Sequence, residues 1–334
     1  MDNGDNSRPT TTRINLMTTT AAAASPTLDS PHHFSKQVLG KDADKIAQSF
    51  SKEGFCILSQ VLDNPVEVAA LKEWQEFGKN YFEHSFETLY QNGYTSAPTH
   101  RVPLDKSNDS NGGKYVLGLG AKHGFREIVM RSPGRYELSL LHCPQDEIPS
   151  ISCFLKPLES LLGKLLCSTN TYSSCSDKDL KLCHLSLLVA TPGSSEQKWH
   201  ADGSHVSISE HLPCHCYNIF IPLQDVPLQL GPTEFRPQGH FLTRNLGPML
   251  LTAKCRKTLR PPVCFPWTMR DVVLFDYRIL HRGKANNQNY NRMVLVMTFS
   301  EPWFKDILNF PKRSMLEPNQ RNSKCTNTTG PGTS

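Results

Sequence analysis

The most constraining feature of the chain is a series of five short β-type runs in its C-terminal half. They are rich in β-branched and aromatic residues and are separated by Gly, Pro and Asn: HLSLLVAT (184–191), CYNIFIPL (216–223), GPTEFRP (231–237), DVVLFD (271–276) and RMVLVMTF (292–299). Short strands divided by turn residues are typical of an all-β sandwich or barrel. We therefore predict a mainly β fold.

The N-terminal half carries helical periodicity instead. One amphipathic helix is expected to end at Gly54, before a short strand, FCIL. A second helix is expected from Pro65, where Asn64 can cap the N-terminus and Glu67 falls at the position of a capping box. The segment 151–167 has the spacing of a third amphipathic helix. Helices followed by many strands predict a β core with flanking helices.

The two ends of the chain differ in composition from the middle. Residues 1–38 and 312–334 carry few large apolar side chains, so we predict that both are disordered. Between them we expect one domain at 39–311. It divides into a helical buttress at 39–168 and a β core at about 183–300.

Composition narrows the functional classes. No window approaches the roughly 18 consecutive apolar residues of a membrane-spanning helix. The formal net charge of +5 comes without a basic block, which gives no support to a nucleic-acid partner. The eleven cysteines form no CxxC pair and no apolar signal-peptide core is present, so we expect reduced thiols and a cytoplasmic protein. The Ser-, Thr- and Ala-rich N-terminal segment, with Arg8 and Arg13, leaves organelle targeting open.

A candidate metal site lies within the β region. In WHADGSH, His200 and Asp202 are two residues apart, so on an extended strand both side chains project to one face. His281 follows a later predicted strand and can supply a third ligand from a neighbouring strand. Two imidazoles and one carboxylate on one face form the ligand set of non-haem Fe(II) oxygenases. Zinc is the nearest chemical alternative, because it also binds His and Asp.

Arg292 adds a second kind of site. It lies eleven residues after His281, at the start of the last predicted strand. A guanidinium there can form a bidentate pair with the distal carboxylate of a ligand that chelates the metal, and 2-oxoglutarate is such a ligand. A surface salt bridge is the alternative role for an isolated arginine.

The motifs together resemble the phytanoyl-CoA dioxygenase (PhyH-like) family of Fe(II)/2-oxoglutarate-dependent oxygenases. The resemblance extends over about residues 45–310, and both the order and the spacing of the motifs agree. Its carriers are SKEGFCILSQVLDNPVEVAALKEW, REIVMRSPGRYEL, WHADG, LGPTEFRPQGH and DVVLFDYRILHRGKANNQNYNRMVLVMTFSEPWF. The fold that this resemblance implies is a double-stranded β-helix, or cupin-like jelly roll.

The resemblance also implies roles for individual residues. The two histidines and the aspartate match the family's iron ligands, and Arg292 matches its 2-oxoglutarate carboxylate binder. Asn218 and Phe220, on one face of CYNIFIPL, lie where the family often lines the co-substrate pocket. The implied cofactor is Fe(II), with 2-oxoglutarate and O2 as co-substrates.

The implied reaction oxidises an unactivated C–H bond of a small or medium organic substrate and decarboxylates 2-oxoglutarate to succinate. Hydroxylation is the expected outcome, and desaturation or oxidative ring closure stays open because the outcome depends on how the substrate lies. Arg126 and Arg131 are candidate contacts for an acidic substrate, with purely structural or solvated charges as the alternative. A catalytically silent 2-oxoglutarate- or metal-binding module and a zinc hydrolase on a cupin-like barrel are the other functional classes.

Overall fold

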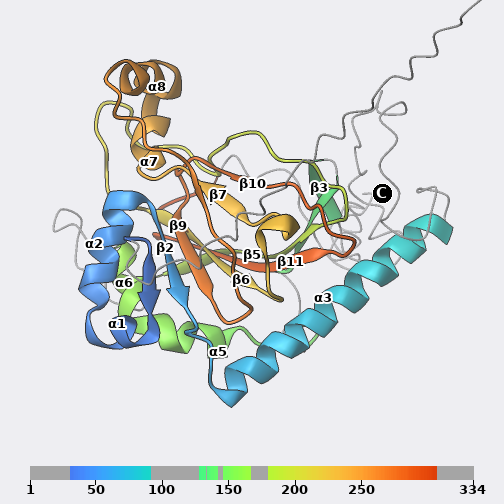
Figure 1. Ribbon diagram of the computed structural model, residues 1–334. Helices are drawn as coiled ribbons and strands as arrows, with labels where there is room; N and C mark the ends of the chain where they lie inside the picture. The colour runs from blue at the N-terminus through green and yellow to red at the C-terminus, as the bar shows by residue number, and fades with distance from the viewer. Residues whose placement is uncertain (1–30, 92–127, 133, 142–145, 167–179, 307–334) are drawn as a thin grey trace, which may run out of the picture.

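The computed structural model describes residues 31–91, 128–132, 134–141, 146–166 and 180–306 (Figure 1). The polar loop at 98–114, Arg126, and the terminal segments 1–30 and 307–334 lie outside the described residues. Two β-sheets form the centre of the described structure. The larger has eight strands in the order β1-β2-β9-β6-β11-β5-β4-β3, and the smaller has three in the order β10-β7-β8.

The strands of the large sheet are β1 (His33–Ser35), β2 (Phe55–Ser59), β3 (Ile128–Ser132), β4 (Arg135–Ser139), β5 (Lys181–Ala190), β6 (Cys216–Pro222), β9 (Val272–Asp276) and β11 (Arg292–Ser300). Those of the small sheet are β7 (Thr233–Phe235), β8 (Val263–Cys264) and β10 (His281–Gly283). The five predicted β runs correspond to β5, β6, β7, β9 and β11. The predicted mainly β, jelly-roll fold with flanking helices is confirmed.

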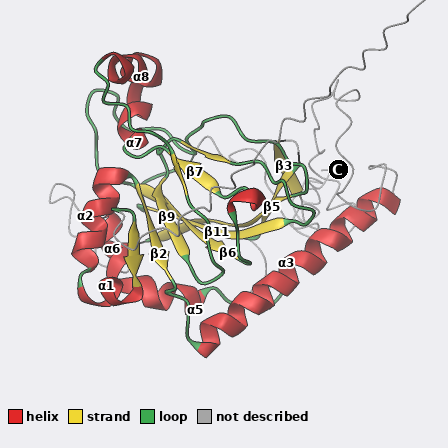
Figure 2. Ribbon diagram, in the orientation of Figure 1, coloured by secondary structure: helices red, strands yellow, loops and turns green. Residues whose placement is uncertain are grey.

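The helices are α1 (Lys36–Lys41), α2 (Ala43–Glu53), α3 (Pro65–Gln91), α5 (Ser152–Leu155), α6 (Glu159–Leu166), α7 (Gly239–Leu242) and α8 (Leu246–Cys255), with 3-10 turns η2 (Lys156–Leu158), η3 (Leu228–Leu230) and η4 (Thr243–Asn245). Figure 2 shows the helices around the edges of the yellow sheets. None of the described helices combines the length and the apolar character that crossing a membrane requires.

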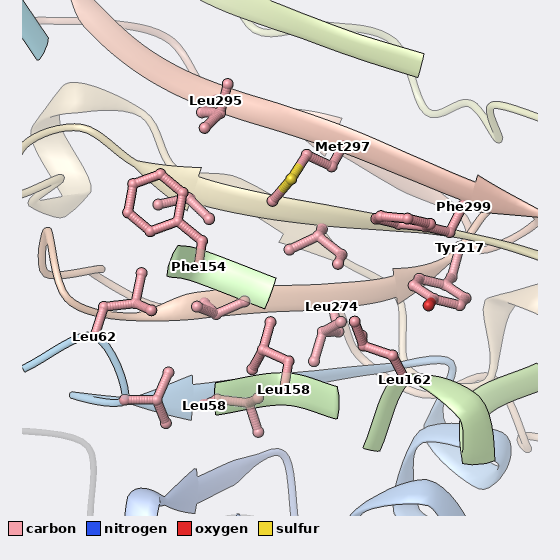
Figure 3. Packing of buried hydrophobic residues seen from close by; sticks show 14 of the residues in the cluster. Leu58, Leu62, Phe154, Leu158, Leu162, Tyr217, Leu274, Leu295, Met297 and Phe299 are labelled. Atoms are coloured by element: carbon pink, nitrogen blue, oxygen red, sulfur yellow. The ribbon is translucent and has the colours of Figure 1, made fainter. Parts of the chain in front are cut away.

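Alternation along the strands gives the large sheet two different faces. One face packs against α1, α2, α3, α5 and α6, and Figure 3 shows part of this cluster, in which Phe154 and Leu158 meet Leu274, Leu295 and Met297. The opposite face carries a second apolar cluster that extends to the small sheet and includes Phe220, Phe235, Val294 and Val296. Neighbouring residues of β11 therefore belong to different clusters, as a period of two requires.

Local signals account for the predicted helix ends. Asn64 Oδ1 accepts hydrogen bonds from the backbone N–H groups of Val66 and Glu67 at 2.9 and 3.0 Å, and Glu67 Oε2 accepts one from the Asn64 N–H at 3.2 Å. This reciprocal pair is the predicted capping box. Gly54 ends α2 with φ 87°, a left-handed conformation that glycine adopts without a Cβ clash.

Two boundaries differ from those predicted. The third helix is divided into α5, η2 and α6, because Pro157 has no N–H to donate and its ring disrupts a continuous α-helix. Ordered structure also begins before residue 39. There β1 pairs in parallel with β2, and His33 and Phe34 are buried in this pairing. The backbone hydrogen bonds to β2 stabilise β1 as a strand, and the composition of residues 1–38 gives no indication of this pairing.

Candidate metal centre

His200, Asp202 and His281 converge at one point of the structure. One ligand atom from each lies within 4.8 Å of the others, the only such group of three or more His, Cys, Asp or Glu side chains in the described part of the chain. His200 and His281 form an isolated antiparallel bridge, in which each backbone N–H donates to the other's carbonyl at 3.1 and 2.9 Å. The bridge places the two imidazole rings side by side, with centroids 4.4 Å apart.

The local backbone differs from the extended strand that the spacing predicted. Of the two residues in the HxD motif, His200 takes part in strand pairing but Asp202 lies in a bend. The third residue, His281, begins β10. The bend is stabilised by Gly203, whose N–H donates to the Tyr277 carbonyl at 2.9 Å. The carboxylate is thereby brought to the two imidazoles by a turn and not by strand alternation.

Hydrogen bonds to the backbone orient both imidazoles. His200 Nδ1 lies 2.8 Å from the carbonyl oxygen of Lys198, and His281 Nδ1 lies 3.1 Å from that of Ile279. A carbonyl can only accept, so each Nδ1 carries a proton, and Nε2 is the ring nitrogen left for a metal. The two Nε2 atoms lie 3.8 and 3.6 Å from Asp202 Oδ1. Burial lowers the pKa of His281 to about 4, which keeps this ring neutral.

This donor set fits a divalent transition metal. Two imidazole nitrogens and one carboxylate oxygen, with the rest of the coordination sphere left to other ligands, match the facial triad that binds non-haem Fe(II). The residues that would hold the ion are the three that the sequence predicted.

A cavity of about 580 Å³ joins the triad to the other predicted site residues. Its walls include Arg292, Asn218, Phe220 and Arg131 together with the three candidate ligands. The structure thus brings together every predicted site residue that lies among the described residues. Arg126 lies outside them.

Arg292 lines this cavity, and the described part of the chain gives it no acidic partner. Its side chain is buried, Nη1 donates to the Gly231 carbonyl, and Nε has no hydrogen-bond partner among the described residues. Burial, reinforced by the nearby Arg135, lowers the pKa of Arg292 to about 9. A buried cation with unused donors is costly unless an anion joins it. The site is therefore suited to a carboxylate.

Arg135 also lines the cavity, and the sequence indicated no link between it and Arg292. The register of the sheet places Arg135 of β4 opposite Ala190 of β5, and Ala190 opposite Arg292 of β11, so the three side chains share one row. Arg135 donates to the carbonyls of Ser195 and Lys284, whereas its Nη1 has no hydrogen-bond partner within the described ranges. Pairing between distant strands creates this row, and no local motif marks it.

Other parts of the cavity wall are polar. Arg131 forms an ion pair with Glu137, so its charge is matched within the protein. Asn218 donates from Nδ2 to Asp202 Oδ2 at 2.7 Å, which ties a predicted co-substrate residue to a candidate metal ligand. Phe220 lies on the same strand face as Asn218 and contributes an apolar part of the cavity wall.

Comparisons with known proteins agree with the predicted family. The family model described as phytanoyl-CoA dioxygenase (PhyH) matches residues 50–294. Among solved structures, AviO1 from Streptomyces viridochromogenes Tue57 is 19% identical, with 79% of this chain and 97% of that chain covered and a TM-score of 0.48. The non-heme alpha ketoglutarate dependent carbocyclase SnoK from nogalamycin biosynthesis is 18% identical (80% and 86% covered, TM-score 0.47), and EctD from S. alaskensis with bound Fe is 14% identical (76% and 75%, TM-score 0.48). Because the family model covers most of the chain, including all four residues predicted to hold iron and 2-oxoglutarate, this protein belongs to the phytanoyl-CoA dioxygenase (PhyH) family of Fe(II)/2-oxoglutarate-dependent oxygenases.

Proposed function

We propose that this protein hydroxylates a C–H bond of a small or medium organic substrate and converts 2-oxoglutarate to succinate and CO2 in the same turnover. The observation that carries the proposal is that one cavity contains both a His–Asp–His donor set and a buried arginine to which the described residues offer no acidic partner. A metal site alone fits many reactions. A metal site beside such a guanidinium fits a co-substrate that chelates with one end and carries a carboxylate at the other.

In this proposal His200, Asp202 and His281 hold Fe(II), which supplies the activation of O2 when it is bound. Arg292 orients 2-oxoglutarate by pairing with its distal carboxylate. Gly231 supports this role, because its carbonyl accepts from Arg292 Nη1 and so fixes the direction of the guanidinium.

The wall between Arg292 and the triad is apolar. Leu188, Phe220 and Val296 line it, and Val296 lies opposite Phe220 in the register of β11 and β6. Such a wall suits the methylene groups of 2-oxoglutarate and excludes water from the reacting centre.

The part of the cavity wall formed by Arg131 and Glu137 is the proposed place for the substrate. Because Glu137 neutralises Arg131, the pair offers a carboxylate acceptor as well as guanidinium donors. We propose that the pair binds a polar group of the substrate. An acidic substrate requires a further cation, a role for which the sequence offers Arg126.

The test is anaerobic. Fe(II) and then 2-oxoglutarate are added to the purified protein, and formation of a weak visible charge-transfer band is expected. On admission of oxygen with a substrate, succinate should form as the band fades. Arg292→Ala should weaken 2-oxoglutarate binding, while Arg256→Ala, which removes an exposed guanidinium at the end of α8, serves as the matched control.

The alternative classes give different results. A catalytically silent module shows the band but forms no succinate with any substrate or extract. A zinc hydrolase is active with Zn²⁺ in the absence of both oxygen and 2-oxoglutarate. Absence of the band in folded, iron-loaded protein refutes the proposal.

A further inference from the structure

The two oxygens of the Asp202 carboxylate have different surroundings. Oδ1 faces the Nε2 atoms of both histidines, at 3.8 and 3.6 Å. Oδ2 accepts a hydrogen bond of 2.7 Å from Asn218 Nδ2. The carboxylate therefore presents one oxygen to the candidate metal position while the other is held by the protein.

A second hydrogen bond fixes the amide that holds Asp202. Thr298 Oγ1 donates to Asn218 Oδ1 at 2.6 Å, and both residues are only 2% exposed. If the amide were rotated by 180°, its carbonyl oxygen would face the Asp202 carboxylate and two acceptors would be opposed. The hydroxyl of Thr298 thus completes the one arrangement in which Asn218 donates to Asp202.

Strand register brings these residues together. Thr298 of β11 lies opposite Asn218 of β6. Two residues along the same strands, and so on the same face of the sheet, Val296 lies opposite Phe220. Val296 and Phe220 belong to the apolar cluster on the cavity side of the sheet. Polar side chains buried beside such a cluster cost free energy unless they are hydrogen-bonded. The free-energy cost of burying Asn218 and Thr298 there is offset by two hydrogen bonds, from Thr298 to Asn218 and from Asn218 to Asp202.

We propose that Asn218 and Thr298 are positioning residues that restrict Asp202 to binding the metal through Oδ1 alone. This inference rests on the proposed function, because it concerns the same iron site. A carboxylate that binds through both oxygens occupies two coordination positions. Restricting it to one keeps three positions available for the two donor atoms of 2-oxoglutarate and for O2. Asn218 accordingly acts through Asp202 and is not primarily a co-substrate contact, which replaces the role that the sequence suggested.

The test measures the metal site without turnover. Metal-free protein is titrated with Co(II), whose visible absorption reports both affinity and coordination geometry, first alone and then with 2-oxoglutarate. Asn218→Leu removes the amide at similar size, and Thr298→Val removes only the hydroxyl. Partners that orient metal ligands typically contribute about 10–100-fold in affinity. We expect a loss of this order in Asn218→Leu, a loss of about 10-fold in Thr298→Val, and an altered Co(II) spectrum in both.

Two further variants separate positioning from general packing. Thr298→Ser keeps the hydroxyl and should restore the wild-type spectrum, with affinity within about threefold. Ser186→Ala is the matched control, since Ser186 is a buried hydroxyl on the adjacent strand β5 and has no hydrogen-bond partner among the described residues. It should leave both affinity and spectrum unchanged. If Asn218→Leu does not fold, as judged by its melting curve, Thr298→Val and Thr298→Ser alone decide the outcome.

The possible failures are distinguishable. If wild-type protein binds neither Co(II) nor Fe(II), or if Asp202→Ala binds as tightly as wild type, the proposed iron site is refuted and this inference falls with it. If wild type binds in an Asp202-dependent way but Thr298→Val and a folded Asn218→Leu match it in affinity and spectrum, only the positioning role is overturned.

Discussion

Replacing Gly231 by Ala should reduce stability through two effects that the structure separates. Gly231 has φ 75° and ψ 60°, and a Cβ there would lie 2.3 Å from the Lys284 carbonyl oxygen and 2.5 Å from that of Ala285. The left-handed conformation costs a non-glycine residue about 1–2 kcal/mol. Overpacking against atoms that cannot rotate away adds about 1–3 kcal/mol. The sum is about 2–5 kcal/mol.

Gly193 provides the matched control. It also has φ 75°, but a Cβ there meets nothing within 4 Å. Gly193→Ala should therefore cost only the conformational part, about 1–2 kcal/mol. Urea unfolding of both variants measures the difference, provided that the m-value is unchanged. Because the Gly231 carbonyl accepts from Arg292, 2-oxoglutarate binding should weaken in Gly231→Ala but not in Gly193→Ala.

Equal destabilisation of the two variants would refute the steric part of this reasoning. It would mean that the segment at 284–285 shifts away from Gly231 at little cost. Unchanged 2-oxoglutarate affinity in Gly231→Ala would separately refute the link between this turn and the direction of the Arg292 guanidinium.

Three further outcomes are expected. Arg278→Met should cost about 3–5 kcal/mol in urea unfolding, because it leaves the Asp276 carboxylate buried without its partner; a cost below about 1 kcal/mol would contradict this. Burial lowers the pKa of His211 from 6.5 to about 3. Between these two values the unfolded chain binds a proton that the folded protein does not, so the free energy of unfolding falls as the pH drops below 6.5. His211→Phe should therefore reduce the dependence of the urea unfolding midpoint on pH. Gly203→Ala would bring a Cβ to 2.2 Å from the Tyr277 ring and displace the bend that carries Asp202, so the affinity for Co(II) should fall. An affinity equal to that of the wild type would show that the Tyr277 ring moves aside and the bend keeps its position.

The parts of the fold that the sequence predicted are those that local physics determines. The capping box at Asn64 and the left-handed Gly54 use atoms within four residues of one another, and both were identified from the residue types. Strands β5, β6 and β11 were identified in the same way, from runs of β-branched and aromatic residues bounded by turn residues. The division of the third helix at Pro157 follows the same local rule, although the apolar spacing on both sides of it predicted a continuous helix.

The parts that were not predicted depend on which strands pair and in what register. The sequence alone indicated no link between Arg135 and Arg292, and only the pairing of β4 with β5 and of β5 with β11 shows that the two residues share a row. Asn218 was assigned to the co-substrate pocket from its place on one strand face, and only the pairing of β6 with β11 shows its link to Thr298. A single sequence contains no signal for such cross-strand neighbours.

Strand β11 shows why so much of the site nevertheless follows from one pattern. On one face it places Leu295 and Met297 in the cluster under the helices, as Figure 3 shows, and on the other it places Arg292, Val296 and Thr298 along the cavity. The order along the cavity face is a cation, then an apolar wall, then a polar group, which is the order of chemical groups needed by a co-substrate with a distal carboxylate, methylene groups and a chelating end. This order is fixed once Leu295 and Met297 pack under the helices, because a shift of the strand by one residue would exchange its two faces. The packing of the helices against β11 therefore also fixes the register of the candidate co-substrate site.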